Sequence, residues 1–167
     1  MNTKKFTLVF VVVVFVAALL VTGALAGQNR NFVAPLSGAE EVPVVDTLAR
    51  GNTVLHVSKD GDSISYKLIV ANIDNVTQAH IHCGAEGVNG PVVVFLFGFV
   101  EGGVTHNGVL AEGTITAGDV IPRPDSEVCP GGIANFDELL DKISSGDAYV
   151  NVHTVEYPAG EIRGQIR

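Results

Sequence analysis

The sequence is short of the residues on which several protein classes depend. It has no tryptophan, one methionine and two cysteines among 167 residues, too few cysteines for a small fold built mainly on disulfides. Basic residues are also scarce: after residue 26, eight Lys and Arg stand against 18 Asp and Glu, a net charge of −10. Phosphate backbones and anionic lipids repel so acidic a chain, and we therefore expect no nucleic-acid partner.

Motifs typical of enzymes are missing as well. The sequence contains no phosphate loop, no HExxH zinc motif, no nucleophile elbow and no carboxylate pair at a diagnostic spacing. Internal repeats and low-complexity tracts are also absent. The hydrophobic content of 47% is too high for a disordered chain. Together these features favour one globular domain without enzymatic activity.

The first 26 residues have the three parts of a secretory signal peptide. Lys4 and Lys5 precede an apolar run over 6–21, which Ala24-Leu25-Ala26 follows. We expect cleavage after Ala26, leaving one domain over 30–167 that is secreted or held in the cell envelope. The alternative is a retained N-terminal anchor, although a run of about 16 residues is shorter than the ~20 that span a bilayer. We expect no integral membrane insertion after cleavage.

Export decides how the two cysteines and a glycosylation sequon are interpreted. In an oxidising compartment an even pair of cysteines is most simply a disulfide, so we expect a bond between Cys83 and Cys129. The alternative is a thiolate metal ligand, because Cys83 directly follows His82. The sequon Asn75-Val76-Thr77 matters only in a host that glycosylates.

Short strands dominate the chain after residue 30. Apolar residues alternate over 63–70, which is typical of a half-buried strand. Similar runs occur at 32–36, 52–58, 76–83, 92–99, 108–116, 147–155 and 161–167. Asp60-Gly61-Asp62 predicts a hairpin, and segments rich in Gly, Pro or Asn predict loops at 84–91, 101–108 and 117–132. About eight strands predict an all-β, antiparallel sandwich or barrel similar to immunoglobulin or superoxide dismutase folds.

One short helix is expected near 135–144. Asn135 or Asp137 can cap its start, and Gly146 can end it. Between them, apolar residues recur at helical spacing, at Phe136, Leu139, Leu140 and Ile143. Cys129 lies in the irregular segment before this helix, so a disulfide to Cys83 would tie that loop to the sheet.

Four segments resemble motifs of the CHRD domain, a module named from chordin and also found alone in secreted microbial proteins. They are LSGAEEVP at 36–43, AHIHCG at 79–84, YVNVHT at 149–154 and PAGEIRGQ at 158–165. The resemblance covers roughly 31–167 and implies an extracellular domain whose molecular role is not settled. It does not carry over chordin's growth-factor binding. The His-x-His segment is also similar to the copper strand of copper/zinc superoxide dismutases, although the other histidines do not follow that family's spacing.

The alternation of side chains along two strands places three histidines on polar faces. Successive side chains alternate between the faces of a strand, so the faces opposite the apolar ones carry His80, His82 and His153. Gln78 and Asn151 lie beside them on the same faces. Three imidazoles from neighbouring strands suit copper or zinc, and His80 or His82 should then lie within ~6 Å of His153. The alternative is that each ring bonds a loop carbonyl and links sheet to loop. His56 is interpreted as structural and His106 as part of an exposed loop.

Arg163 argues against a metal at this position. If 148–155 and 161–167 form a hairpin with matched apolar faces, His153 lies opposite or nearly opposite Arg163, with Glu161 on the same polar face. A guanidinium there disfavours a dication unless Glu161 neutralises it, and it favours a small anion. Glu161 and Arg163 could also form a solvated salt bridge. A guanidinium pointing into the histidine cluster would favour the anion.

Three functions remain open. The first is a secreted, non-enzymatic binding or structural module whose extracellular ligand or protein partner the sequence does not identify, and which requires no cofactor. The second is a copper- or zinc-binding protein that uses His80, His82 and His153, with redox chemistry as an option. The third is a cell-envelope adhesion module whose acidic surface meets basic partners or Ca²⁺.

Overall fold

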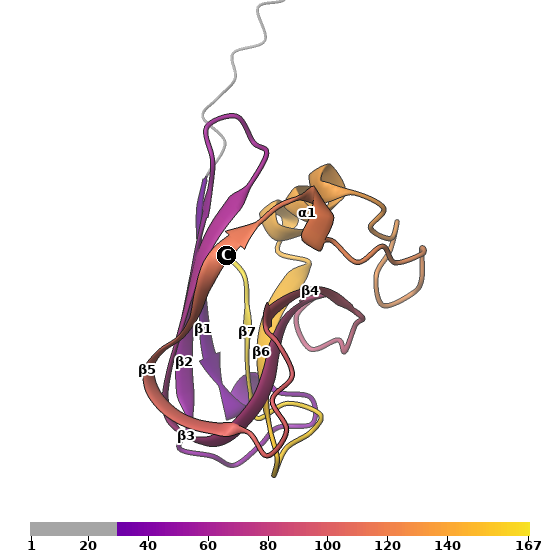
Figure 1. Cartoon of the computed structure of the whole chain (residues 1–167). Helices are drawn as coiled ribbons and strands as arrows, with labels where there is room; N and C mark the ends of the chain where they lie inside the picture. Colours follow the sequence, from indigo (N-terminus) through magenta and orange to yellow (C-terminus); the bar gives the residue numbers. More distant parts are fainter. Residues whose placement is uncertain (1–29) are drawn as a thin grey trace, which may run out of the picture.

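The computed structural model describes residues 30–167, and the signal peptide expected at 1–26 lies outside the described residues. Seven strands and one α-helix make up this part of the chain (Figure 1). Their bounds are β1 Asn31–Ser37, β2 Arg50–Val57, β3 Ile64–Cys83, β4 Val92–Phe97, β5 Val104–Ile115, α1 Phe136–Ser145, β6 Ala148–Thr154 and β7 Ile162–Gln165. Short 3-10 turns lie at Gly38–Glu40 and Ala117–Asp119.

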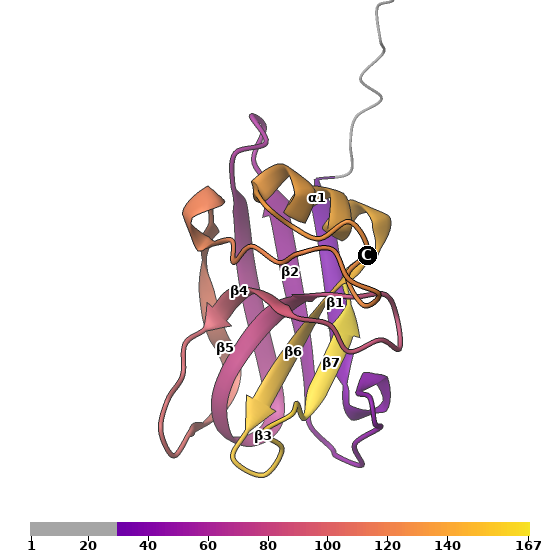
Figure 2. The same cartoon turned by 90° about the vertical axis from the view of Figure 1, so that its right-hand side faces the viewer.

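Five of the strands close into an antiparallel barrel. β1 pairs with β2, β2 with β3, β3 with β6, β6 with β7, and β7 returns to β1. β5 pairs with the first part of β3, and β4 pairs with its last residues. The helix α1 lies at one end of the barrel (Figure 2). The structure therefore confirms an all-β antiparallel fold with one short helix, and the fold is a barrel.

The strands expected at 63–70 and 76–83 are parts of one long strand. β3 has 20 residues, and it bends where Asn72 and Asn75 take positive φ values of 54° and 51°, a conformation that Asn tolerates better than most residues. Figure 1 shows β3 curving round one end of the barrel. Because of this bend, β3 pairs with β2 along its first half and with β6 along its second.

The loop expected at 101–108 is shorter in the structure. A turn at Gly102 and Gly103, which both have positive φ, brings the chain back so that β5 begins at Val104. His106 lies opposite Ile73 of β3, so it belongs to a strand and is half-buried, not part of an exposed loop. Register shifts interrupt this pairing, which explains why the sequence shows no clear alternation here.

The helix follows the expected pattern. Asn135 caps its start by accepting a hydrogen bond from the backbone N–H of Glu138 at 3.0 Å. Gly146 ends it with a left-handed φ of 79°. Phe136, Leu139 and Ile143 bury one face of α1 in the core. Among residues 30–167, no helix has the length and apolar character needed to cross a membrane.

A disulfide joins Cys83, the last residue of β3, to Cys129 in the loop before α1. It confirms the pairing expected from the sequence and excludes the thiolate-ligand alternative, because both sulfurs are bonded to each other. Cys83 lies in the hydrophobic core, on the face of β3 opposite His80 and His82. On the chain-entropy model a cross-link of this span contributes about 4 kcal/mol to stability.

Candidate metal centre

A second buried layer lies on the outside of the barrel wall. Its members alternate with core residues along β3, β6 and β7, and we call them the outer polar layer: His80, His82, Tyr149, Asn151, His153, Arg163 and Gln165. Each is at most 7% exposed. Loop carbonyls of residues 84–90 and 158 contact these side chains. The polar face predicted from the alternation is therefore covered by loops and is not a solvated surface.

The structure brings the three histidines together. Nδ1 of His80 lies 3.0 Å from Nε2 of His153, which is well inside the separation expected from the strand pattern. One ring nitrogen from each of His80, His82 and His153 lies within 4.8 Å of the others. The pairing of β3 with β6 places Gln78 opposite His153, His80 opposite Asn151 and His82 opposite Tyr149. Every second residue pair of one ladder, on the same face, therefore supplies one of the three rings.

Backbone carbonyls determine which nitrogen carries the proton in two of the rings. Nδ1 of His82 lies 2.9 Å from the Gly90 carbonyl oxygen, and Nδ1 of His153 lies 2.9 Å from that of Pro158. A carbonyl oxygen only accepts hydrogen bonds, so both Nδ1 atoms are N–H donors. In a neutral ring Nε2 of His153 then bears the lone pair, and it accepts the hydrogen bond from Nδ1 of His80.

This arrangement leaves two imidazole lone pairs unused. Within residues 30–167, neither Nε2 of His80 nor Nε2 of His82 has a hydrogen-bond partner, and both atoms are buried. A buried acceptor without a partner costs about 1–3 kcal/mol. A ligand that takes up both lone pairs would remove this cost.

Burial keeps the rings neutral. It lowers the pKa of His80 to about 3, and the neighbouring rings of His153 and His82 act in the same direction. Burial also lowers the pKa of His82 to about 4, although its hydrogen bond to Gly90 acts against the shift. The pKa of His153 is lowered by burial as well. All three rings are therefore in the neutral form that metal ions require.

Arg163 borders the cluster, but a loop holds its guanidinium. The side chain is 1% exposed and donates to Oδ1 of Asn89 at 3.1 Å and to the carbonyls of Ala85 at 3.2 Å and Val88 at 3.0 Å. Its Cζ lies 3.4 Å from the centre of the Tyr149 ring. The guanidinium is thus directed to the 85–89 loop and not into the histidine cluster.

In the hairpin of β6 and β7, His153 is nearly opposite Arg163, as expected, and not directly opposite it. Arg163 lies opposite Asn151, and Ile162 lies opposite Val152, so His153 is two residues further along β6 than the partner of Arg163. The predicted parity is correct, since both side chains lie on the polar face. In the connection between β6 and β7, the Glu161 N–H donates to the Val152 carbonyl.

Among residues 30–167, Glu161 forms no ion pair with Arg163. Its carboxylate accepts hydrogen bonds from the hydroxyls of Thr47 at 2.7 Å and Thr154 at 2.8 Å. The ion pairs found between residues 30 and 167 are Lys67–Glu112 and Arg167–Glu86. The solvated Glu161–Arg163 salt bridge considered from the sequence does not form, because both side chains are buried with other partners.

The remaining histidines lie elsewhere. His56 of β2 is exposed, and its Nδ1 lies 2.7 Å from Oδ1 of Asn31, which fits the structural role expected for it. The structure adds Tyr149 to the site instead: its ring stacks on that of His82, with centres 4.8 Å apart and planes at 11°. Strand alternation places Tyr149 on the polar face, but only the cross-strand pairing reveals the stack.

Glu41 is a candidate functional residue that the sequence argument missed. It is 6% exposed, and burial raises its pKa to about 7 although the charge of Arg163 and a hydrogen bond with the Val42 backbone oppose the shift. Its only sequence signal is its position in the segment at 36–43. Acidic residues in such a loop are usually solvated, so nothing local indicated burial.

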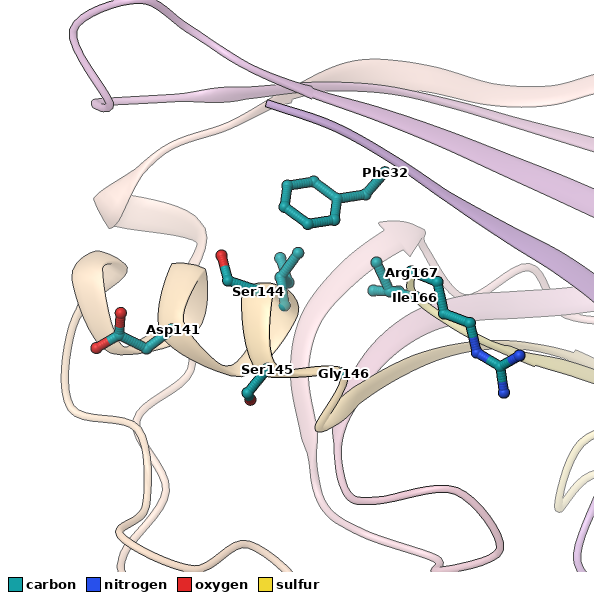
Figure 3. Close-up of a pocket in the computed structure, with 8 residues that line it drawn as sticks. Phe32, Asp141, Ser144, Ser145, Gly146, Ile166 and Arg167 are labelled. Atoms are coloured by element: carbon teal, nitrogen blue, oxygen red, sulfur yellow. The ribbon is translucent and has the colours of Figure 1, made fainter. Parts of the chain in front are cut away.

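A cavity at the C-terminal end of α1 is not a comparable site. It has about 480 Å³ and lies between the C-terminal end of α1 and the ends of β1 and β7. In Figure 3 the side chains of Asp141 and Ser145 point away from the Phe32 ring. A binding site usually has polar groups that converge on the cavity, and this one lacks that feature.

Comparison with known proteins identifies one relationship. A family model described as the CHRD domain matches residues 32–166. This range includes both histidine-bearing strands and the segment that contains Glu41. No curated protein and no solved structure matches the chain.

Proposed function

The chain belongs to the CHRD domain family, and we propose that it is an exported, non-enzymatic module that binds one copper or zinc ion through His80, His82 and His153. One observation carries this proposal. Three buried, neutral imidazoles meet within 4.8 Å, and two of them present Nε2 lone pairs that no group in residues 30–167 satisfies. A metal ion would satisfy both.

The hydrogen bonds around the rings support metal binding. A histidine ligand usually donates its other N–H to a carbonyl or carboxylate, which fixes its tautomer and orientation. His82 and His153 already do this through Gly90 and Pro158. Three neutral nitrogen donors without a thiolate suit copper or zinc better than calcium or magnesium, which prefer oxygen.

Binding to all three rings requires one rearrangement. Nε2 of His153 accepts the hydrogen bond of His80, so this lone pair becomes available to a metal only when the His80 ring turns away. The His80 ring packs perpendicular to Phe95, with ring centres 4.5 Å apart. Phe95 lies in β4 and is exposed, so the ring that His80 contacts on this side is not itself enclosed.

The position of Arg163 favours a dication over an anion. Its guanidinium donates to three acceptors in the 85–89 loop, and these bonds direct it toward that loop and away from the cluster. The disulfide between Cys83 and Cys129 supports an oxidising, extracytoplasmic location.

Calorimetric titration of chelator-treated protein with Zn²⁺ and with Cu²⁺ tests the proposal. One ion should bind per chain with a Kd below about 10 µM. His82→Asn and His153→Asn should each weaken binding at least about tenfold, since loss of a ligand costs no less than loss of a supporting contact. His56→Asn is the matched control and should bind as the unaltered protein does. Folded protein that binds neither ion more tightly than about 10 µM contradicts the proposal.

A further inference from the structure

Glu41 reaches the outer polar layer through a gap left by a glycine. Gly160 has a φ of +132°, and a Cβ built on it would lie 2.5 Å from Oε1 of Glu41 and 2.8 Å from Nδ2 of Asn151. The Glu41 carboxyl and the Asn151 carboxamide therefore approach each other over this glycine. Asn151 is the cross-strand neighbour of His80.

The surroundings of Glu41 favour a neutral carboxyl in the metal-free protein. Its Oε1 is buried and has no hydrogen-bond partner among residues 30–167. An ionised carboxylate with one oxygen left unpaired is costly to bury. The raised pKa of Glu41, about 7, has the same cause, with the charge of Arg163 acting against it.

Other charged and titratable groups surround Glu41. Arg163 approaches from β7, and Tyr149 approaches from β6, where a charge on Glu41 raises the tyrosine pKa. Glu156 and Tyr157 face Glu41 across a cavity of about 230 Å³. Glu161 bonds Thr47 of the same loop. Arg163 is held by neutral acceptors, so its positive charge remains to be balanced within the layer.

We propose that Glu41 is the charge-balancing acid of the metal site, protonated while the site is empty and ionised once a dication enters. The inference rests on the proposed function. Three neutral imidazoles bring no negative charge, and a dication buried near Arg163 needs a compensating anion. For each metal ion that binds, the O–H bond of the Glu41 carboxyl breaks and one proton is released to solvent.

This assignment predicts an unusual pH dependence. The hydrogen bonds hold the His153 ring in its neutral form, since Nε2 accepts from His80 while Nδ1 donates to Pro158, and burial lowers the pKa values of His80 and His82 well below the usual 6.5. Proton competition at the ligands therefore does not limit binding near neutral pH. Release of one proton from Glu41 makes affinity rise about tenfold per pH unit below pH 7 and level off above it.

Calorimetry with Zn²⁺ in buffers of different ionisation enthalpy measures the proton release directly. At pH 6, below the usual titration of zinc-bound water, the unaltered protein should release close to one proton per Zn²⁺. Glu41→Gln should release almost none and should bind Zn²⁺ at pH 8 about tenfold more weakly, because the balancing charge is lost. Glu156→Gln, which removes an acid from the same cavity, is the control and should retain the release.

The outcomes separate the two proposals. Zn²⁺ binding with equal proton release in the unaltered protein and in Glu41→Gln overturns the role of Glu41 and leaves the metal site standing. Absence of Zn²⁺ binding overturns both. If Glu41→Gln does not fold, carbon-13 NMR of the Glu41 carboxyl in the unaltered protein decides: at pH 6 its shift should change from that of an acid to that of a carboxylate when Zn²⁺ binds. An unchanged shift contradicts the proposal.

Discussion

Nδ1 of His80 donates to Nε2 of His153 across 3.0 Å, although 73 residues separate the two in sequence. This hydrogen bond is linked to a second one, in which Nδ1 of His153 donates to the Pro158 carbonyl. The two hydrogen bonds run in one direction, because the carbonyl oxygen can only accept. At the other end of this series, Nε2 of His80 is buried and has no hydrogen-bond partner within the described residues.

The first prediction concerns the protonation of the three clustered histidines. In metal-free protein, nitrogen-15 NMR should show His80, His82 and His153 as neutral rings protonated at Nδ1 at pH 7, because burial lowers the pKa of each. His80 and His82 should remain so at pH 5, since their pKa values are about 3 and about 4. Zn²⁺ should shift the Nε2 signals of the same three rings and leave those of His56 unchanged. A ring protonated at Nε2 in His82 would contradict the assignment.

The second prediction concerns acid stability. The pKa of each clustered histidine lies below the usual 6.5, so below that pH the unfolded chain binds protons that the folded protein does not. Glu41 acts in the opposite sense between its ordinary 4.5 and about 7, because there the folded state holds the extra proton. Each of these groups changes the free energy of unfolding by up to about 1.4 kcal/mol per pH unit. The three histidines together therefore outweigh Glu41.

Urea unfolding of metal-free protein at pH 7, 6 and 5 measures this balance. The free energy of unfolding should fall with acidification, and it should fall more steeply in Glu41→Gln because the opposing contribution is gone. His153→Asn should show a shallower dependence than the unaltered protein. A free energy of unfolding that rises from pH 7 to pH 5 would contradict the histidine contribution.

The third prediction concerns Arg163. Arg163→Met removes the donor for Asn89 and for the carbonyls of Ala85 and Val88. Leaving several buried acceptors unpaired should lower the free energy of unfolding by about 3–5 kcal/mol. Arg167→Met is the control: Arg167 forms an exposed ion pair with Glu86, which is worth at most about 1 kcal/mol. Equal effects of the two substitutions would contradict the buried role of Arg163.

The fourth prediction concerns the disulfide. Alkylation of the intact protein without reductant should label neither Cys83 nor Cys129, as mass spectrometry can show. Replacing both by alanine should lower the free energy of unfolding by a few kcal/mol, about 4 on the chain-entropy model, without changing the sheet. Stoichiometric labelling of Cys83 in the native protein would contradict the bond.

Local periodicity was sufficient for several features. Alternation placed Ile81 and Val150 on the core face and His80 and His153 on the other, because successive side chains of any strand point to opposite faces. The cap at Asn135 and the stop at Gly146 were also readable, since both act within one helical turn. Local signals failed at Asn72 and Asn75, where a break in the alternation indicated two strands but the backbone bends and continues.

The sequence by itself determined the strand-rich class, the helix, the pairing of two cysteines and the shared polar face of the histidines. Only the tertiary structure decided that β3 lies beside β6, which brings His80 to His153, and that loops bury the polar face. It also decided that Arg163 is held by the 85–89 loop and that Glu41 is enclosed at Gly160. Side-chain direction follows from the backbone of each strand, whereas contacts between distant segments depend on how all strands pack and close together.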